Sequence, residues 1–113
     1  MNQEINSGAV RILREYTGRG PTKARSVIDE NSVTILFGDT LTAGERRLAD
    51  SGKAESVLSM RHDFQMVMRD DLVKMVEDAI DRKVIAFMSA NHIAPDMAVE
   101  VFVLEPAERP VAG

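Results

Sequence analysis

Three cations and two glycines lie close together in the segment YTGRGPTKAR, residues 16–25, which contains no acidic side chain. Clustered cations beside a backbone that a ligand can approach closely are typical of sites for small anions or acidic partners. We therefore predict an anion- or partner-binding site formed by Arg19, Gly20, Lys23 and Arg25. The alternative interpretation is a glycine that ends a helix, followed by a rigid turn and solvated cations.

A nucleotide-binding loop is not expected in this segment. Such loops follow a strand and open a helix, so that backbone N–H groups face the phosphates. Here Gly18 follows a helix-forming segment, and the spacing from the glycines to Lys23 is not that of a Walker loop. The segment is therefore interpreted as the end of a helix, with cations that are either solvated or face an anionic ligand.

Two histidine–aspartate pairs are the other places where chemistry is conceivable. His62 and Asp63 are adjacent, but a helical metal site needs a second ligand four residues away, where apolar residues stand. His92 and Asp96 share one loop, yet no third group completes a base, an orienting group or a metal site. We predict no catalytic residue, no metal and no cofactor. An enzyme of unrecognised type, built on these pairs, is the least favoured alternative.

The composition is that of a soluble protein with one domain. The chain has 113 residues, of which 44% are hydrophobic and 28% are charged, with a formal net charge of −4 and no cysteine. The acidic balance argues against a nucleic-acid-binding protein, and the absence of cysteine fits a reducing cytoplasm. No apolar run has the length of a membrane span, so we expect no direct membrane insertion and no secretory signal. We predict one domain over residues 1–106 and a flexible tail over residues 107–113.

The pattern of apolar residues predicts an α+β fold. We expect a helix over residues 5–16, a hairpin of two strands over 27–37, and further strands over 84–90 and 97–104. Thr42 and Glu45 match a capping box, which predicts a short helix that begins at Ala43 and ends near Asp50. The expected architecture is a four-stranded, mostly antiparallel sheet with one long helix and two shorter helices packed on one face.

Residues 54–80 form the longest periodic segment. Their apolar residues recur every three or four positions, and a helix of this length spans roughly 40 Å at about 1.5 Å per residue. Because that exceeds what a small domain needs, either the helix kinks or its apolar flank meets another subunit. We predict a homodimer or partner interface formed by Met60, Phe64, Met68 and Met75. Core packing of these side chains is the alternative.

Several segments, GRGPTKAR, LTAGERRLA, SMRHDF and KVIAFMSANHIAPDMAVEVFVLEP, together resemble one bacterial family. It is the small MpsC-like family, formerly a domain of unknown function, whose label comes from a sodium-translocating, membrane-potential-generating system. The resemblance covers nearly the whole chain, and its most specific parts are residues 18–21, 41–45 and 102–105. It implies a cytoplasmic accessory protein linked with a membrane cation or bicarbonate uptake system, and it implies no established activity, cofactor or active site.

One position departs from this resemblance. Asp81 stands where similar sequences tend to have glycine, so the exit from the long helix is expected to be capped differently. The residues and the resemblance together predict a small soluble accessory or regulatory protein. Its Gly-Arg-Gly-Pro loop would contact an acidic partner or a small anion, and its partners would be a second copy and a membrane transport protein. A structural or assembly homodimer without a ligand is the alternative.

Overall fold

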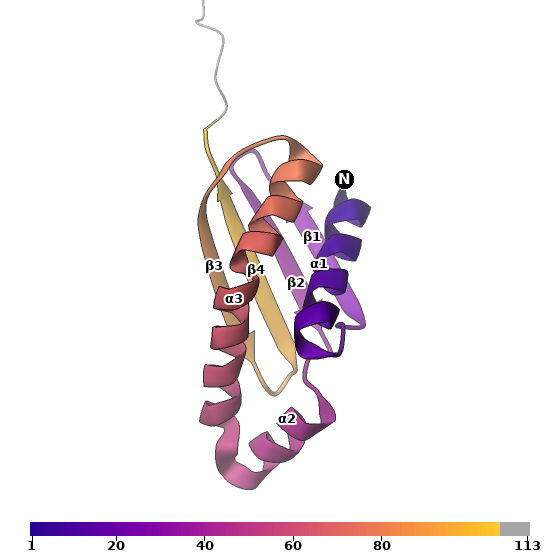
Figure 1. Ribbon diagram of the computed structural model, residues 1–113, viewed down its shortest axis with the longest axis vertical. Helices are drawn as coiled ribbons and strands as arrows, with labels where there is room; N and C mark the ends of the chain where they lie inside the picture. The colour runs from indigo at the N-terminus through magenta and orange to yellow at the C-terminus, as the bar shows by residue number, and fades with distance from the viewer. Residues whose placement is uncertain (107–113) are drawn as a thin grey trace, which may run out of the picture.

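A four-stranded sheet with helices on one face organises the chain in a computed structural model that describes residues 1–106 (Figure 1). The elements are α1 (Asn2–Thr17), β1 (Lys23–Ile28), β2 (Ser32–Gly38), α2 (Ala43–Leu48), η1 (Ala49–Lys53), α3 (Ala54–Ile80), β3 (Val84–His92) and β4 (Met97–Leu104). The α+β fold predicted from periodicity is confirmed, including the bounds of the long helix. The tail predicted over residues 107–113 lies outside the described residues.

The strands lie in the order β1-β2-β4-β3, and every neighbouring pair is antiparallel. Short connections join β1 to β2 and β3 to β4, whereas the chain between β2 and β3 passes through all of α2, η1 and α3. β2 and β4 are therefore central, and β1 and β3 form the two edges of the sheet.

The core lies between the sheet and two helices, α1 and α3, which run side by side over the same face (Figure 1). On β4 the buried positions alternate strictly with half-buried ones, as expected of a strand with one covered face. Phe102 of β4 meets Phe87 of β3 with ring centroids 5.3 Å apart. The largest fully buried side chains are Phe37, Phe102, Ile5, Ile35, Met68, Leu72, Leu104, Glu100, Val33, Val57 and Val76.

α3 has 27 residues, and its first turns reach past the end of the sheet to meet α2 (Figure 1). Thr42 caps α2 by the predicted capping box, in which its hydroxyl accepts from Glu45 N and Glu45 accepts from Thr42 N. The predicted break after Asp50 is a wide π-type turn, η1, in which Gly52 has a φ of 83°. α2, η1 and α3 therefore form a bent helical arm at one end of the sheet.

No helix in residues 1–106 is both long enough and apolar enough to cross a lipid bilayer. α3 has the length, but charged residues recur along it, and its buried stripe is broken by polar side chains.

Both long helices end in the same way, which corrects the expectation for Asp81. Gly18 ends α1 with φ 80°, and its N–H donates to Arg14 O at 2.9 Å. Asp81 ends α3 with φ 54° and ψ 46°, and its N–H donates to Glu77 O at 2.9 Å. The aspartate thus takes the left-handed conformation that glycine prefers. The cap is therefore of the same type, and the difference from glycine is steric strain at the Cβ of Asp81.

Replacing Asp81 by glycine should raise stability by about 0.5–1 kcal/mol, because glycine adopts a positive φ without steric cost. Thermal unfolding should show a midpoint roughly 2–4 °C higher than that of the parent protein. Asp39 also has a positive φ, 59°, but its carboxylate is bound to other residues. Asp39→Gly should therefore lower the midpoint, and an equal rise in both variants would contradict this account.

Candidate functional site

A cluster of paired charges lies at the end of the sheet where the loop after α1, the loop after β2, and the β3–β4 loop meet. Asp39 pairs with Arg19 Nη2 at 2.8 Å and with Arg46 Nη2 at 2.7 Å, and it also accepts from the Thr22 hydroxyl at 2.9 Å. Hydrogen bonds from Thr22 and Arg19 hold the pKa of Asp39 below its ordinary value. We call this cluster of Arg19, Asp39, Arg46 and Asp96 the ionic junction.

Asp96 fixes the β3–β4 loop to the segment that follows β2. Its carboxylate accepts from Thr40 N at 3.0 Å, from Thr40 Oγ1 at 2.8 Å and from Leu41 N at 3.0 Å. Arg46 Nη2 also pairs with this carboxylate, at 2.9 Å. These bonds join the β3–β4 loop to the segment after β2 and to α2, so Asp96 holds the three segments together.

A buried ion pair joins α2 to α3 beneath this junction. Arg61 of α3 donates to both carboxylate oxygens of Glu45, with Nε to Oε2 at 2.7 Å, and its Nη2 also donates to Thr40 O at 2.6 Å. The side chains are only 5% and 6% exposed. Burial acts to raise the pKa of Glu45, but the bonds from Arg61 and Thr42 outweigh it and hold the pKa below its ordinary value.

The structure separates the four residues of the predicted anion site. Arg19 is bound to Asp39, and its guanidinium also donates to Asp39 O at 2.6 Å and to Leu41 O at 3.1 Å. Gly20 packs closely against the side chains of Val10 and Arg14. Arg19 thus holds the loop in place, whereas Lys23 and Arg25 are exposed on β1. That these residues bind an anion or a partner remains a prediction, and the geometry favours Lys23 and Arg25 for that role.

Lys23 and Arg25 lie at one border of the sheet face that no helix covers. Strand register places four rows of residues across this face, and the row of Arg25 continues through Leu36 and Val99 to Ala90. We call it the open face, and it consists of Lys23, Arg25, Val27, Ser32, Thr34, Leu36, Gly38, Ala86, Met88, Ala90, His92, Met97, Val99, Val101 and Val103.

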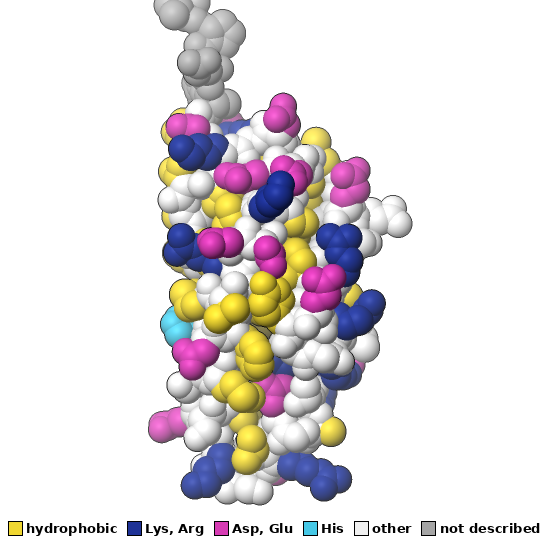
Figure 2. Space-filling model, viewed as in Figure 1, with side chains coloured by type: hydrophobic (Ala, Val, Ile, Leu, Met, Phe, Trp, Pro, Cys, Tyr) yellow, Lys and Arg dark blue, Asp and Glu magenta, His cyan; other side chains and the backbone are white. Residues whose placement is uncertain are grey.

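The open face is apolar and carries no acidic residue, although the whole chain has a net charge of −4. Val27, Leu36 and Met88 on it are 55%, 41% and 53% exposed. A sheet face of this composition is normally covered by another layer of structure. The opposite, helix-covered surface has scattered charges of both signs around a strip of hydrophobic side chains (Figure 2).

The methionines of the predicted interface lie in different environments. Met68 is 2% exposed and belongs to the core, and Met75 packs on Gly8 of α1, so the structure places both inside the protomer. Met60 is 38% exposed and Phe64 is half-buried. An interface through Met60 and Phe64 remains a prediction, and Val67, 65% exposed, extends their stripe at helical spacing.

Within residues 1–106, no group of three or more potential metal ligands forms around either histidine–aspartate pair. His62 and Asp63 are both exposed on α3. His92 Nδ1 lies 2.7 Å from Pro95 O, while Asp96 is occupied by the backbone donors described above.

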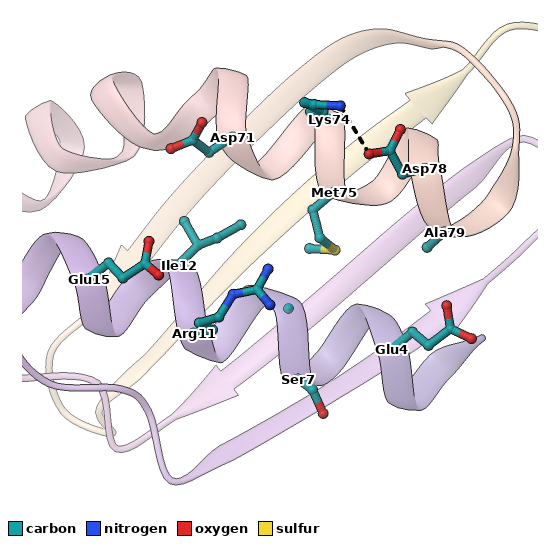
Figure 3. A pocket seen from close by; sticks show the side chains of 11 residues that line it. Glu4, Ser7, Arg11, Ile12, Glu15, Asp71, Lys74, Met75, Asp78 and Ala79 are labelled. Atoms are coloured by element: carbon teal, nitrogen blue, oxygen red, sulfur yellow. Dashed lines mark hydrogen bonds and ion pairs between the residues drawn. The ribbon is translucent and has the colours of Figure 1, made fainter.

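A surface groove lies between α1 and α3 (Figure 3). Met75 forms part of its floor. Four acidic and two basic residues also line it: Glu4, Glu15, Asp71, Asp78, Arg11 and Lys74. Several of these groups already have partners, since Tyr16 donates to Asp71 at 2.7 Å and Lys74 pairs with Asp78 at 3.1 Å. The groove is therefore a poor site for an anion, and the polar side chains among its described lining residues are all exposed.

Glu100 is a site that sequence reasoning missed. It lies on the covered face of β4, is 1% exposed, and accepts from Gln65 Nε2 of α3 at 3.2 Å. Gln65 and Asn91 of β3 also exchange amide hydrogen bonds at 2.8 and 3.1 Å, while Glu100 Oε2 has no partner among the described residues. Burial raises the pKa of Glu100 to about 7, from an ordinary 4.5.

The spacing of α3 contains the signal that would have found these polar residues. Its fully buried stripe is Val57, Arg61, Gln65, Met68, Leu72 and Val76. Extending the apolar positions 76, 72 and 68 toward the start of the helix leads directly to Gln65 and Arg61. A polar residue on a buried stripe requires a partner, which Glu100 and Glu45 supply.

Removing Arg61 should be far more costly than removing Arg46. Arg61→Leu leaves Glu45 buried without its cation, and a loss of about 3–5 kcal/mol is expected in denaturant unfolding. The double variant Glu45→Leu/Arg61→Leu should lose less than the two single variants added together. Arg46 is 48% exposed, so Arg46→Leu should cost about 1 kcal/mol or less. Equal costs at both arginines would contradict this assignment of the buried pair.

Stability should fall as Glu100 ionises. Its folded pKa lies above its unfolded pKa, so its stabilising contribution is complete below the unfolded value and is lost as pH rises through about 7. The shift corresponds to about 3 kcal/mol at 1.36 kcal/mol per unit. Glu100→Gln should remove this loss in unfolding curves measured between about pH 5 and pH 8. Glu105→Gln is the control, because it removes one exposed carboxyl while Glu100 stays in place, so the fall in stability should persist.

Comparison with known proteins gives one family and no structural relative. No solved structure matches the chain. The family model described as MpsC, Na+-translocating membrane potential-generating system, matches residues 1–106, which include the ionic junction, the buried pair and both hairpins. Since the match spans all but the last seven residues, the chain belongs to the MpsC family.

Proposed function

We propose that the protein is a non-catalytic accessory or regulatory subunit that binds an acidic protein partner through its open face. The single observation that carries this proposal is the bare, acid-free apolar face of the sheet in an otherwise acidic protein. The family description places related chains with a Na+-translocating system, so the proposed partner belongs to a membrane cation-transport system. The protein would act from the cytoplasmic side, without cofactor.

The apolar part of the open face supplies the driving force for docking. Val27, Leu36 and Met88 are each more than two-fifths exposed, and the central valines of β4 lie half-buried between them. Burying such side chains contributes about 25 cal/mol for each Å² removed from water. A partner element that lies across β2 and β4 would therefore gain most of its contact area from these rows.

The cations of β1 supply orientation and specificity. Lys23 and Arg25 border the apolar rows, and no acidic side chain of the open face competes for them. Acidic groups at the margin of a partner's apolar surface would complement them, which raises the association rate and fixes the docking register. Arg19 is not part of this contact, because Asp39 neutralises it; its role is to hold the loop that leads into β1.

Reversing the charge of the β1 border tests this function. The parent protein should capture a membrane-transport protein from the host membrane fraction, and the purified pair should then bind in a titration. Lys23→Glu/Arg25→Glu should weaken that binding by at least about tenfold, and rising salt should weaken the parent complex more than the variant complex. Leu36→Glu should abolish binding, since it places a charge among the apolar rows.

The matched control is Arg47→Glu/Lys53→Glu, which makes the same charge change at exposed positions of the helical arm. It should bind like the parent. If the control loses binding and the β1 variant keeps it, the open face is not the docking surface. A small-anion site would instead show saturable shifts of the backbone amides of residues 19–25 with phosphate or bicarbonate, and that result would replace the acidic partner by an anion.

A further inference from the structure

The two edges of the sheet differ in how well they are protected. On β1, Asn2 of α1 donates to Ser26 O at 2.8 Å, and the charged side chains of Lys23 and Arg25 stand on the strand itself. Charged residues and a covering helix are the usual means of preventing an edge strand from pairing with another chain. β1 is therefore a protected edge.

β3 has none of these protections over most of its length. It is nine residues long, VIAFMSANH, and contains no acidic residue, lysine, arginine or proline. Ile85 and Met88 on it are 55% and 53% exposed. Its start is covered, where Val84 N donates to Glu77 Oε2 at 2.8 Å, and a register shift between Val84 and Ala86 bends the strand there. From Ala86 to His92 no other strand of the described chain pairs with the outer edge.

We propose that β3 pairs antiparallel with β3 of a second copy, and so forms a homodimer with one continuous eight-stranded sheet. A two-fold axis through the middle of the strand places Met88 opposite its own copy and Ala86 opposite Ala90. Such a pairing is self-complementary, as a two-fold interface requires. It sets no like charges opposite one another and satisfies the backbone donors and acceptors of both edges.

On the covered face, the pairing brings the two α3 helices next to each other, because α3 contacts β3. Packed helices lie about 8–10 Å apart, so the two α3 flanks would form part of the interface. Near this edge, Arg69 and Asp70 of α3 line one hollow with Ile85 and Phe87 of β3, and the two charges form a weak pair at 3.8 Å.

Dimerisation through β3 would extend the open face rather than cover it. The two open faces would join at Met88, and the cationic β1 borders would lie at the two far ends. The dimer would thus present a doubled apolar floor with a cationic margin on each side. This inference concerns a different contact from the partner docking proposed above, and each can fail without the other.

Oligomeric mass and site-specific crosslinking test the proposal on the whole chain. Sedimentation equilibrium of the parent protein at micromolar concentrations should give twice the mass of one chain. Met88→Glu should give the one-chain mass, because it sets two carboxylates opposite each other at the axis. Val27→Glu, equally exposed on the same face but on β1, should remain dimeric. Circular dichroism and thermal unfolding establish that both variants are folded.

The crosslink locates the contact directly, because the chain has no cysteine of its own. Opposed residues of an antiparallel pair have Cα atoms about 5 Å apart, which suits a disulfide. With copper–phenanthroline as oxidant, Met88→Cys should form a covalent dimer, whereas Val27→Cys and Met60→Cys should not. A one-chain mass for the parent protein would overturn the proposal. So would a crosslink at Met60→Cys or Val27→Cys without one at Met88→Cys.

Discussion

Two long helices can cover only one face of a four-stranded sheet, and the rest of the molecule follows from that limit. α1 and α3 lie on the same face, and every large, fully buried side chain of the strands points toward them. Burial of that face is the main stabilising contribution, since nonpolar area removed from water dominates folding. The other face keeps its β-branched and methionine side chains in contact with solvent. The placement of both helices on one face therefore stabilises the fold and also leaves an apolar surface open to a binding partner.

Much of the architecture could be predicted, because local signals agreed with the tertiary structure. Gly18, the Thr42–Glu45 capping box and the period of residues 54–80 each act within a few residues of chain, and each was confirmed. The prediction for the end of α3 was wrong for a physical reason. Asp81 adopts the left-handed conformation at an energetic cost that the tertiary contacts offset, so aspartate in place of glycine leaves the type of cap unchanged.

The candidate site was harder to predict, because pairing across the chain decides which charges are available. Arg19 looked like a ligand-binding cation until the structure placed Asp39, twenty residues away, against it. On α3, Met60 and Phe64 have the hydrophobicity of core residues, yet Arg61 and Gln65 take the buried positions because Glu45 and Glu100 meet them there. Hydrophobicity alone cannot predict which of these side chains is buried, since a buried polar residue is stable only with a partner from elsewhere in the chain.

The polar residues on the buried stripe of α3 also explain why the helical arm holds its position past the end of the sheet. Beyond the apolar core, Arg61 connects α3 to Glu45 of α2 and to the Thr40 carbonyl, while Asp96 brings the β3–β4 loop to the same place. Hydrogen bonds with fixed directions specify one orientation of the arm, whereas apolar contacts alone would permit several. The cost is that Met60 and Val67 are exposed and Phe64 is only half-buried. Exposed apolar residues on α3, on the open face and along β3 thus have one origin: the single layer of helices is fully used in covering the other side of the sheet.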